Sequence, residues 1–210
     1  MRRTTRIVVG AVVVLAASTA VVAQQPPAGG EYYPLKVGNK WTYKVGDTTT
    51  IEMKVDKIEA GEATLSTSVN GKQVATESVK VDATGVLRTK INGTAITPPV
   101  KFLALPVKKG EEWSVDSKIN VSGQEHAIKG KFTIKDDKEK VKVRDKDYET
   151  VVVDGPDFDI AGTKTAVKYW FAAGKGVVKL TYTIAGNEAV LELTDFTEAT
   201  TAPAAAGGGK

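Results

Sequence analysis

The chain of 210 residues contains no cysteine and only one histidine. Without thiols it can form no disulfide, no cysteine-ligated zinc site, no thiol nucleophile and no lipid-modified N-terminal cysteine. Any histidine-based metal site or Ser-His-Asp triad would depend on His126 alone. The Gly-x-Ser-x-Gly, His-Glu-x-x-His and Walker motifs are also missing. These absences predict a protein that is not an enzyme and that carries no cofactor and no metal.

The N-terminal segment has the pattern of an export signal. Three arginines within the first six residues precede an uncharged apolar run, Ile7–Val22, and Val21 and Ala23 occupy the −3 and −1 positions of a signal-peptidase site. We predict a Sec signal peptide over residues 1–23, cleaved after Ala23. The alternatives are an uncleaved membrane anchor, because the apolar segment reaches the short end of a membrane span, and a twin-arginine signal. All of them place the remaining chain outside the cytoplasm, secreted or periplasmic.

Removal of residues 1–23 changes the charge balance. Three of the 29 basic residues leave with the signal peptide, so 26 basic and 25 acidic side chains remain and the net charge falls to +1. This balance argues against a nucleic-acid partner and against an anionic membrane surface. The remaining 187 residues are enough for one domain with a core of its own.

The rest of the chain reads as short strands separated by turns. Runs of four to ten residues alternate between apolar and polar side chains, and the pairs Asn70–Gly71 and Asn92–Gly93 are strong hairpin signals. No useful length shows the 3.6-residue period of a helix. We predict an all-β fold, an antiparallel meander that forms a curved sheet, an open barrel or a sandwich. It occupies one domain over residues 31–196, after a linker over residues 24–30 and before a disordered tail over residues 197–210.

One phrase occurs twice in the domain. Tyr32–Val45 and, in shorter form, Leu105–Val115 each run from a proline through a glycine turn to a tryptophan that starts an alternating segment. The two tryptophans, Trp41 and Trp113, are 72 residues apart. The repeat predicts two sheet-building halves, about residues 31–104 and 105–196. A tryptophan at the start of a strand is typical of a core plug, and we expect that role rather than a ligand platform.

Three polar or proline-containing segments are predicted to interrupt the strands. Thr97–Ala104 contains two adjacent prolines, which are not expected in a central strand. Asp136–Lys140 is a run of charged residues and is predicted to be a solvated hairpin tip. Asp154–Asp159 combines Gly-Pro with three carboxylates and is predicted to be a turn.

The candidate chemical sites are few. Asp154, Asp157 and Asp159 could bind calcium outside the cell, although their spacing is not that of a known calcium loop, and loop acids without a ligand are the simpler interpretation. Acids from distant strands could also meet as a glycosidase pair, which sequence does not show. His126 is expected to be a half-exposed strand residue. Gly174–Gly176 is expected to be a hairpin turn, since no helix follows to present amides to a phosphate.

Three phrases support a family resemblance: Tyr32–Trp41, Trp170–Lys179 and Glu192–Phe196. They resemble the Tyr-x-Pro-Leu-x-x-Gly-x-x-Trp opening, the Trp-(Tyr/Phe)-Ala-x-Gly-x-Gly-x-Val-Lys phrase and the last strand of a family of exported bacterial proteins of unknown function. The resemblance implies a curved antiparallel half-barrel similar to those of lipoprotein carriers, with a concave face and no catalytic residues. The loop Val143–Tyr148 departs from the Val-Pro-Ala-Gly turn of relatives.

The sequence therefore predicts an exported, non-catalytic β-protein that binds an apolar small molecule or an envelope protein through a sheet face. Both faces of the strands are apolar at Val151–Val153 and Val177–Val178, as expected for a sheet that curls around a core or a ligand. The alternative is a structural or adhesive module of the cell envelope. A hydrolase that uses paired acids comes third.

Overall fold

The computed structural model describes residues 29–200, which form twelve antiparallel strands. The strands are β1 Lys40–Val45, β2 Thr49–Glu59, β3 Glu62–Val69, β4 Lys72–Asp82, β5 Gly85–Ile91, β6 Thr94–Ala104, β7 Glu112–Val121, β8 Gln124–Val143, β9 Lys146–Ile160, β10 Thr163–Ala172, β11 Gly176–Ile184 and β12 Asn187–Thr197. Within this range there is no helix that could cross a membrane. The predicted signal peptide, residues 24–28 of the linker and residues 201–210 of the tail lie outside the described residues.

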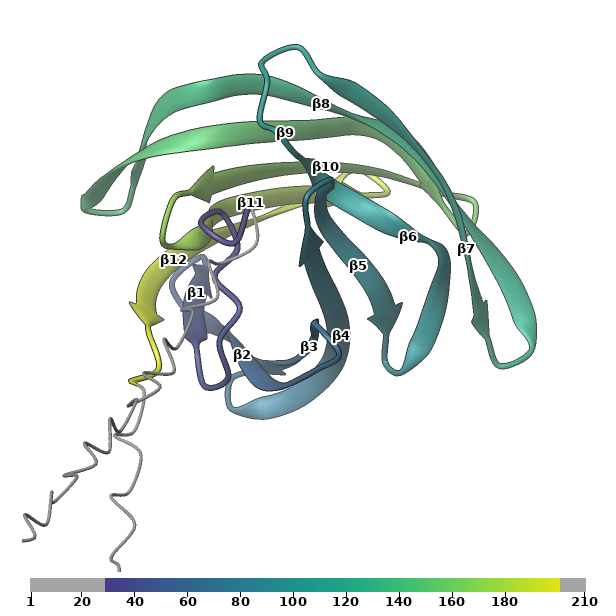
Figure 1. Ribbon diagram of the computed structural model, residues 1–210, viewed down its shortest axis with the longest axis horizontal. Helices are drawn as coiled ribbons and strands as arrows, with labels where there is room; N and C mark the ends of the chain where they lie inside the picture. The colour runs from purple at the N-terminus through teal and green to yellow at the C-terminus, as the bar shows by residue number, and fades with distance from the viewer. Residues whose placement is uncertain (1–28, 201–210) are drawn as a thin grey trace, which may run out of the picture.

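Each strand pairs with the next one along the chain, and β1 also pairs with β12, so the meander closes into a barrel (Figure 1). The predicted all-β antiparallel class is confirmed. The sheet closes on itself, which goes beyond the half-barrel implied by the family resemblance. Closure gives every strand a partner on both sides, which reduces the backbone left open for pairing with other chains.

The hairpin turns follow from local backbone geometry. At Asn70–Gly71 and Asn92–Gly93 both residues have positive φ, 48° and 81° in the first turn and 49° and 78° in the second. A two-residue type I′ turn requires this conformation, and asparagine followed by glycine adopts it at low cost. Both predicted hairpins are confirmed. The loop that departs from the family pattern also makes a two-residue turn, with Arg144 at a φ of 55°.

A chain of aromatic rings packs in the core of the barrel. Trp41, which is 2% exposed, stacks on Tyr33, and Tyr33 meets the edge of Phe102 at a centroid distance of 5.6 Å. Phe102 in turn contacts Tyr169 and Phe171, at 5.8 and 6.2 Å. Rings at these separations add specific contacts to the burial of their area. The middle of the barrel is therefore mostly filled by side chains.

The β8–β9 hairpin is longer than its neighbours and reaches over the outside of the barrel (Figure 1). Trp170 lies on the opposite face of β10 from Phe171. Its indole N–H donates a hydrogen bond to the side chain of Glu139 on β8 at 2.9 Å. At the tip, Arg144 donates to the carbonyl oxygen of Gly46 at 3.2 Å. This part of the sheet is thus covered on both faces, which explains why the apolar side chains of Val151–Val153 are all buried.

Two predicted turns are wrong because they lie within these long strands. Asp136–Lys140 is part of β8, and the true hairpin tip is at Arg144–Asp145. The register between β8 and β9 shifts on both sides of Asp136, so the charged run is accommodated by bulges rather than by a reversal of the chain. Asp154–Asp159 is likewise part of β9 and pairs with β10 through another register shift.

The prolines of β6 do lie in a strand, contrary to expectation, but the ladder is interrupted there. Between β6 and β7 only two residue pairs are in register, Ile96 with Ile119 and Thr97 with Lys118. The pairing stops at Pro98, as expected for residues without an N–H donor. Beyond it the indole N–H of Trp113 donates to the carbonyl oxygen of Lys101 at 2.9 Å. A side chain thus replaces part of the missing ladder, at the boundary between the two predicted halves.

Candidate functional site

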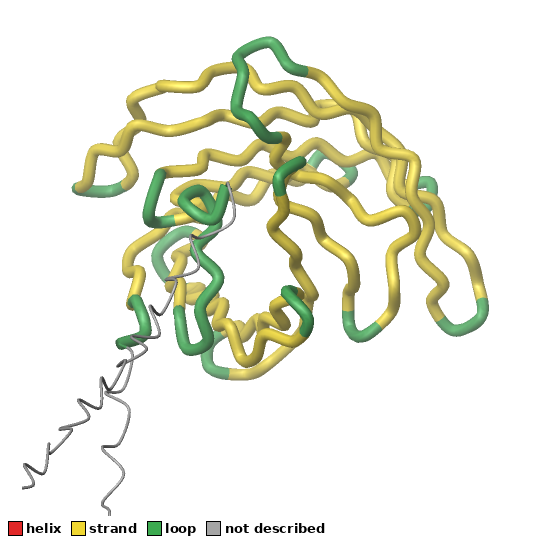
Figure 2. Tube along the Cα trace, in the orientation of Figure 1, coloured by secondary structure: helices red, strands yellow, loops and turns green. Residues whose placement is uncertain are grey.

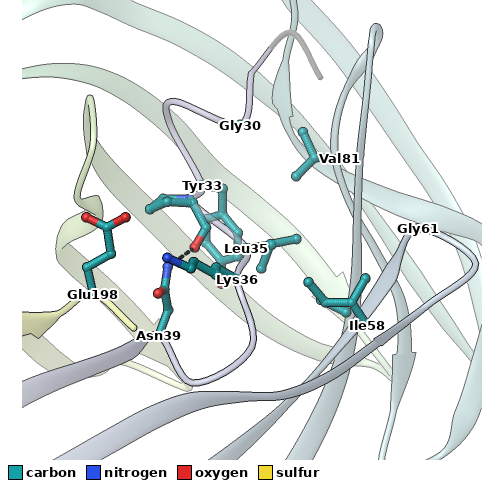
Figure 3. Close-up of a pocket in the computed structure, with 11 residues that line it drawn as sticks. Gly30, Tyr33, Leu35, Lys36, Asn39, Ile58, Gly61, Val81 and Glu198 are labelled. Atoms are coloured by element: carbon teal, nitrogen blue, oxygen red, sulfur yellow. Dashed lines mark hydrogen bonds between the residues drawn. The ribbon is translucent and has the colours of Figure 1, made fainter. Parts of the chain in front are cut away.

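An apolar cleft lies beneath the loop formed by residues 29–39 (Figure 3). Figure 2 draws the backbone of this loop in green, next to the strand β1 that follows it. Its volume is about 390 Å³. The lining residues come from this loop, from the ends of β2, β3 and β4, and from the residue after β12: Gly30, Tyr33, Pro34, Leu35, Lys36, Asn39, Ile58, Gly61, Ala63, Val81 and Glu198. Among them the only charged side chains are Lys36 and Glu198. A concave, largely apolar site of this size is typical of small-molecule binding.

Asn39 ties this loop to the other end of the chain. The side chain is 1% exposed, and its Nδ2 donates to the carbonyl oxygen of Pro34 at 2.8 Å. Its Oδ1 accepts a hydrogen bond from the backbone N–H of Ala199, just beyond β12, at 2.9 Å. Trp41 adds a further link, because its indole N–H donates to the carbonyl oxygen of Lys175 at 2.6 Å. The wall of the cleft is therefore held by buried hydrogen bonds.

Deeper in the barrel, Glu77 of β4 and Arg88 of β5 form an ion pair. The Arg88 Nε lies 2.6 Å from the Glu77 Oε2, and the two side chains are 26% and 11% exposed. The guanidinium also lies over the Phe102 ring, 5.2 Å from its centroid. The second carboxylate oxygen, Glu77 Oε1, is buried and has no hydrogen-bond partner among the described residues. An unpaired buried acceptor is costly, so this atom needs a functional or structural explanation.

A second cavity of about 80 Å³ adjoins this ion pair. It is lined by Tyr33, Tyr43, Met53, Glu77, Arg88, Phe102, Tyr169, Val177, Leu180 and Leu191. The Tyr43 hydroxyl donates to the carbonyl oxygen of Val177 at 2.9 Å. The cavity thus combines apolar walls with one acid, one base and three phenols.

The surroundings of the cavity keep the phenols neutral and the guanidinium charged. Burial, followed by the charge of Glu77, raises the pKa of Tyr33 and of Tyr43 above the usual value. Burial also raises the pKa of Tyr169, although Arg88 opposes the rise. Burial acts to lower the pKa of Arg88, but the attraction of Glu77 and the nearby phenols outweighs it, and the pKa is raised. At neutral pH the ion pair has no net charge and the three tyrosines carry their protons.

Tyr33 is the one residue that lines both the cleft and the interior cavity. It is 6% exposed and belongs to the loop of residues 29–39 rather than to a strand. The two spaces therefore adjoin at Tyr33.

The residues singled out by sequence lie elsewhere. His126 is on β8, opposite Ile119, and is half-buried. Asp159 pairs with Lys164 at 3.4 Å and accepts a hydrogen bond from the Gly162 N–H. In the described part of the chain, no three His, Asp or Glu side chains are grouped as a metal site would require. Gly174–Gly176 forms the β10–β11 turn, with both glycines at positive φ.

The sequence interpretation missed Glu77 and Arg88. Glu77 alternates with Val79 and Val81 on one face of β4, and Arg88 shares a face of β5 with Val86. A charged residue in an otherwise apolar alternation is a signal for a partly buried ion pair. The register between β4 and β5 shifts between Ser78 and Val79, where β5 carries one extra residue. The contact between Glu77 and Arg88 depends on this shift. Local pattern does not predict this bulge.

No protein-family model and no curated protein matches the chain. Solved structures do match. A proposed lipoprotein of Parabacteroides distasonis is 11% identical, with a TM-score of 0.50 over 77% of this chain and 96% of its own. A proposed exported protein of Bacteroides fragilis, with a YmcC-like fold, is 12% identical, with a TM-score of 0.54 over 78% of this chain and 97% of its own.

The fold of this chain is similar to the folds of these two proteins. The hypothetical lipoprotein YmcC of Escherichia coli also matches, at 13% identity and a TM-score of 0.42, over 79% of this chain and 86% of its own. At such identities the likeness is one of fold. The Parabacteroides and Bacteroides structures are consistent with the expected resemblance to exported bacterial proteins of unknown function, while the motif phrases themselves stay predictions.

Proposed function

We propose that this protein is a non-catalytic binding protein of the bacterial cell envelope that holds an apolar small molecule in the cleft beneath residues 29–39. The observation that carries this proposal is the cleft itself, which has the volume and the apolar lining of a ligand site. Tyr33 and Leu35 supply apolar walls from the loop and Ile58 supplies one from β2, so the site exists only in the folded barrel.

An envelope location rests on two independent supports. The N-terminal sequence has the three regions of an export signal. Two structural neighbours are described as an exported protein and as a lipoprotein. Because this chain has no cysteine, it cannot carry a lipid on an N-terminal cysteine, and we propose a periplasmic or released protein.

Titration with N-phenyl-1-naphthylamine, a neutral apolar dye that fluoresces when it leaves water, tests the proposal. Ile58 is 40% exposed at the rim of the cleft, and Ile184 is 46% exposed on β11 and does not line it. Ile58→Glu places a charge in the apolar site and should weaken dye binding about tenfold, whereas the matched control Ile184→Glu should bind as the wild type does.

Two results would contradict the proposal. Equal weakening by both substitutions would mean that the dye binds somewhere other than the cleft. Absence of saturable binding to the wild-type protein would favour the alternative function, a module for contact with other envelope proteins.

A further inference from the structure

We infer that Glu77 forms the head-group end of the same ligand site, and that the ligand is a neutral amphiphile with a hydroxyl head and an apolar tail. This inference rests on the proposed function of the cleft and adds the chemical class of the ligand. Its basis is the unpartnered Glu77 Oε1 beside an interior cavity that shares Tyr33 with the cleft.

The free oxygen specifies a hydrogen-bond donor. Glu77 Oε2 is already engaged by Arg88, while Oε1 is buried and accepts nothing from the described residues. A carboxylate oxygen can only accept, so the group that satisfies it must donate a proton. A bond to a charged acceptor is also stronger than one between neutral groups, which makes Oε1 an effective anchor.

The charge of the site specifies that the donor is neutral. Glu77 and Arg88 cancel each other, and the three phenols beside them are uncharged at neutral pH. A cationic head would gain from Glu77 but would meet the guanidinium of Arg88 in the same small cavity. An anionic head would meet the carboxylate. Either ion would lose its hydration on entering this site, and the site has no net opposite charge to compensate that loss. A hydroxyl group costs far less to desolvate.

The sizes of the two spaces specify an amphiphile. The interior cavity of about 80 Å³ has room for a hydroxyl and the first carbons of a chain. The cleft of about 390 Å³ has room for the apolar remainder. Tyr33 is the one residue that lines both, so we place the passage between them at Tyr33, whose side chain must move for a ligand to occupy both. Because Tyr33 lies in a loop, its movement breaks no pairing between strands.

The test compares octan-1-ol with 1-methoxyheptane, which has the same atoms and nearly the same shape but no hydroxyl. Each competes with N-phenyl-1-naphthylamine for the wild-type protein, and octylammonium is measured alongside. We expect octan-1-ol to bind about tenfold more tightly than the ether, as one hydrogen bond to a charged acceptor provides. Equal affinities would overturn the inference, since Oε1 would then be satisfied by water alone. Tighter binding of octylammonium than of octan-1-ol would overturn the neutral head.

A double substitution locates the effect. Glu77→Leu with Arg88→Met removes both charges together, so neither is left buried without its partner, and such replacements are often tolerated. The preference for alcohol over ether should disappear in this variant while the affinity for the ether is retained. An unchanged preference would overturn the role of Glu77 and leave the proposed function standing. Failure of every compound and of the dye to bind the wild-type protein would instead overturn the proposed function.

Discussion

Two glycines on neighbouring strands make room for a pair of buried aromatic rings, and filling that room should destabilise the barrel. Phe132 and Phe158 pack with their centroids 4.6 Å apart and are 2% and 3% exposed. A Cβ on Gly155 would lie 2.5 Å from Phe158 and 2.8 Å from Phe132. A Cβ on Gly130 would lie 2.6 Å from Phe158. Neither glycine has positive φ, so the cost of Gly155→Ala comes from space and not from backbone strain.

The expected magnitude is a balance of two effects. Ordinary contacts between carbon atoms lie at about 3.5 to 4.0 Å, so both rings must move by about 1 Å. Overpacking of this kind costs about 1 to 3 kcal/mol. Alanine also restricts the unfolded chain more than glycine does, which returns about 0.4 to 1 kcal/mol. At the midpoints of these ranges, Gly155→Ala should lower the free energy of unfolding by about 1.3 kcal/mol, and by about 2.6 kcal/mol at most.

Urea unfolding of a double-mutant cycle measures this effect. The variants are Gly155→Ala, Phe158→Leu and the two combined. If the ring of Phe158 is what the new methyl group meets, the substitution at Gly155 should cost less in the Phe158→Leu background than in the wild type. A neutral or stabilising Gly155→Ala would refute the reasoning. So would an equal cost in both backgrounds, because it would place the strain elsewhere.

Three further predictions concern other contacts. Trp113→Phe keeps a ring between β6 and β7 but loses the hydrogen bond to the carbonyl oxygen of Lys101. It should lower the free energy of unfolding by about 1 kcal/mol and speed hydrogen exchange in both strands. Exchange that increases equally in all strands would contradict the local role. Asn39→Ala loses two hydrogen bonds from a residue that is 1% exposed and should cost about 2 kcal/mol in urea unfolding, whereas exposed Asn187→Ala should cost almost nothing. A hydrogen bond from Lys90 is the main cause that lowers the pKa of Glu62. The stability that Glu62 contributes is therefore present above its unfolded pKa and is lost as pH falls through the folded pKa. Glu62→Gln should reduce the acid-induced fall in melting temperature below about pH 4.3. An identical dependence of melting temperature on pH in both proteins would show that the Glu62–Lys90 pair contributes nothing.

Much of the fold class could be predicted from sequence because its causes are local. Alternation with a period of two selects strands, and the Asn-Gly pairs at 70–71 and 92–93 specify two-residue turns through their positive φ. The same local reasoning was wrong at Asp136–Lys140, where a run of charged residues resembles a turn. There the strand continues because its polar groups find partners across the chain, such as the side chain of Glu139, which accepts from Trp170.

The candidate site could be predicted only in part. The sequence itself determined an all-β chain without thiol chemistry and with a tryptophan-centred opening phrase, and it predicts an export signal. Tertiary structure decided that β1 meets β12, that the opening phrase covers a cleft, and that Glu77 meets Arg88. The physical reason is distance along the chain and register. Barrel closure joins residues more than 150 positions apart, and a single extra residue in β5 sets which charged side chains face each other inside.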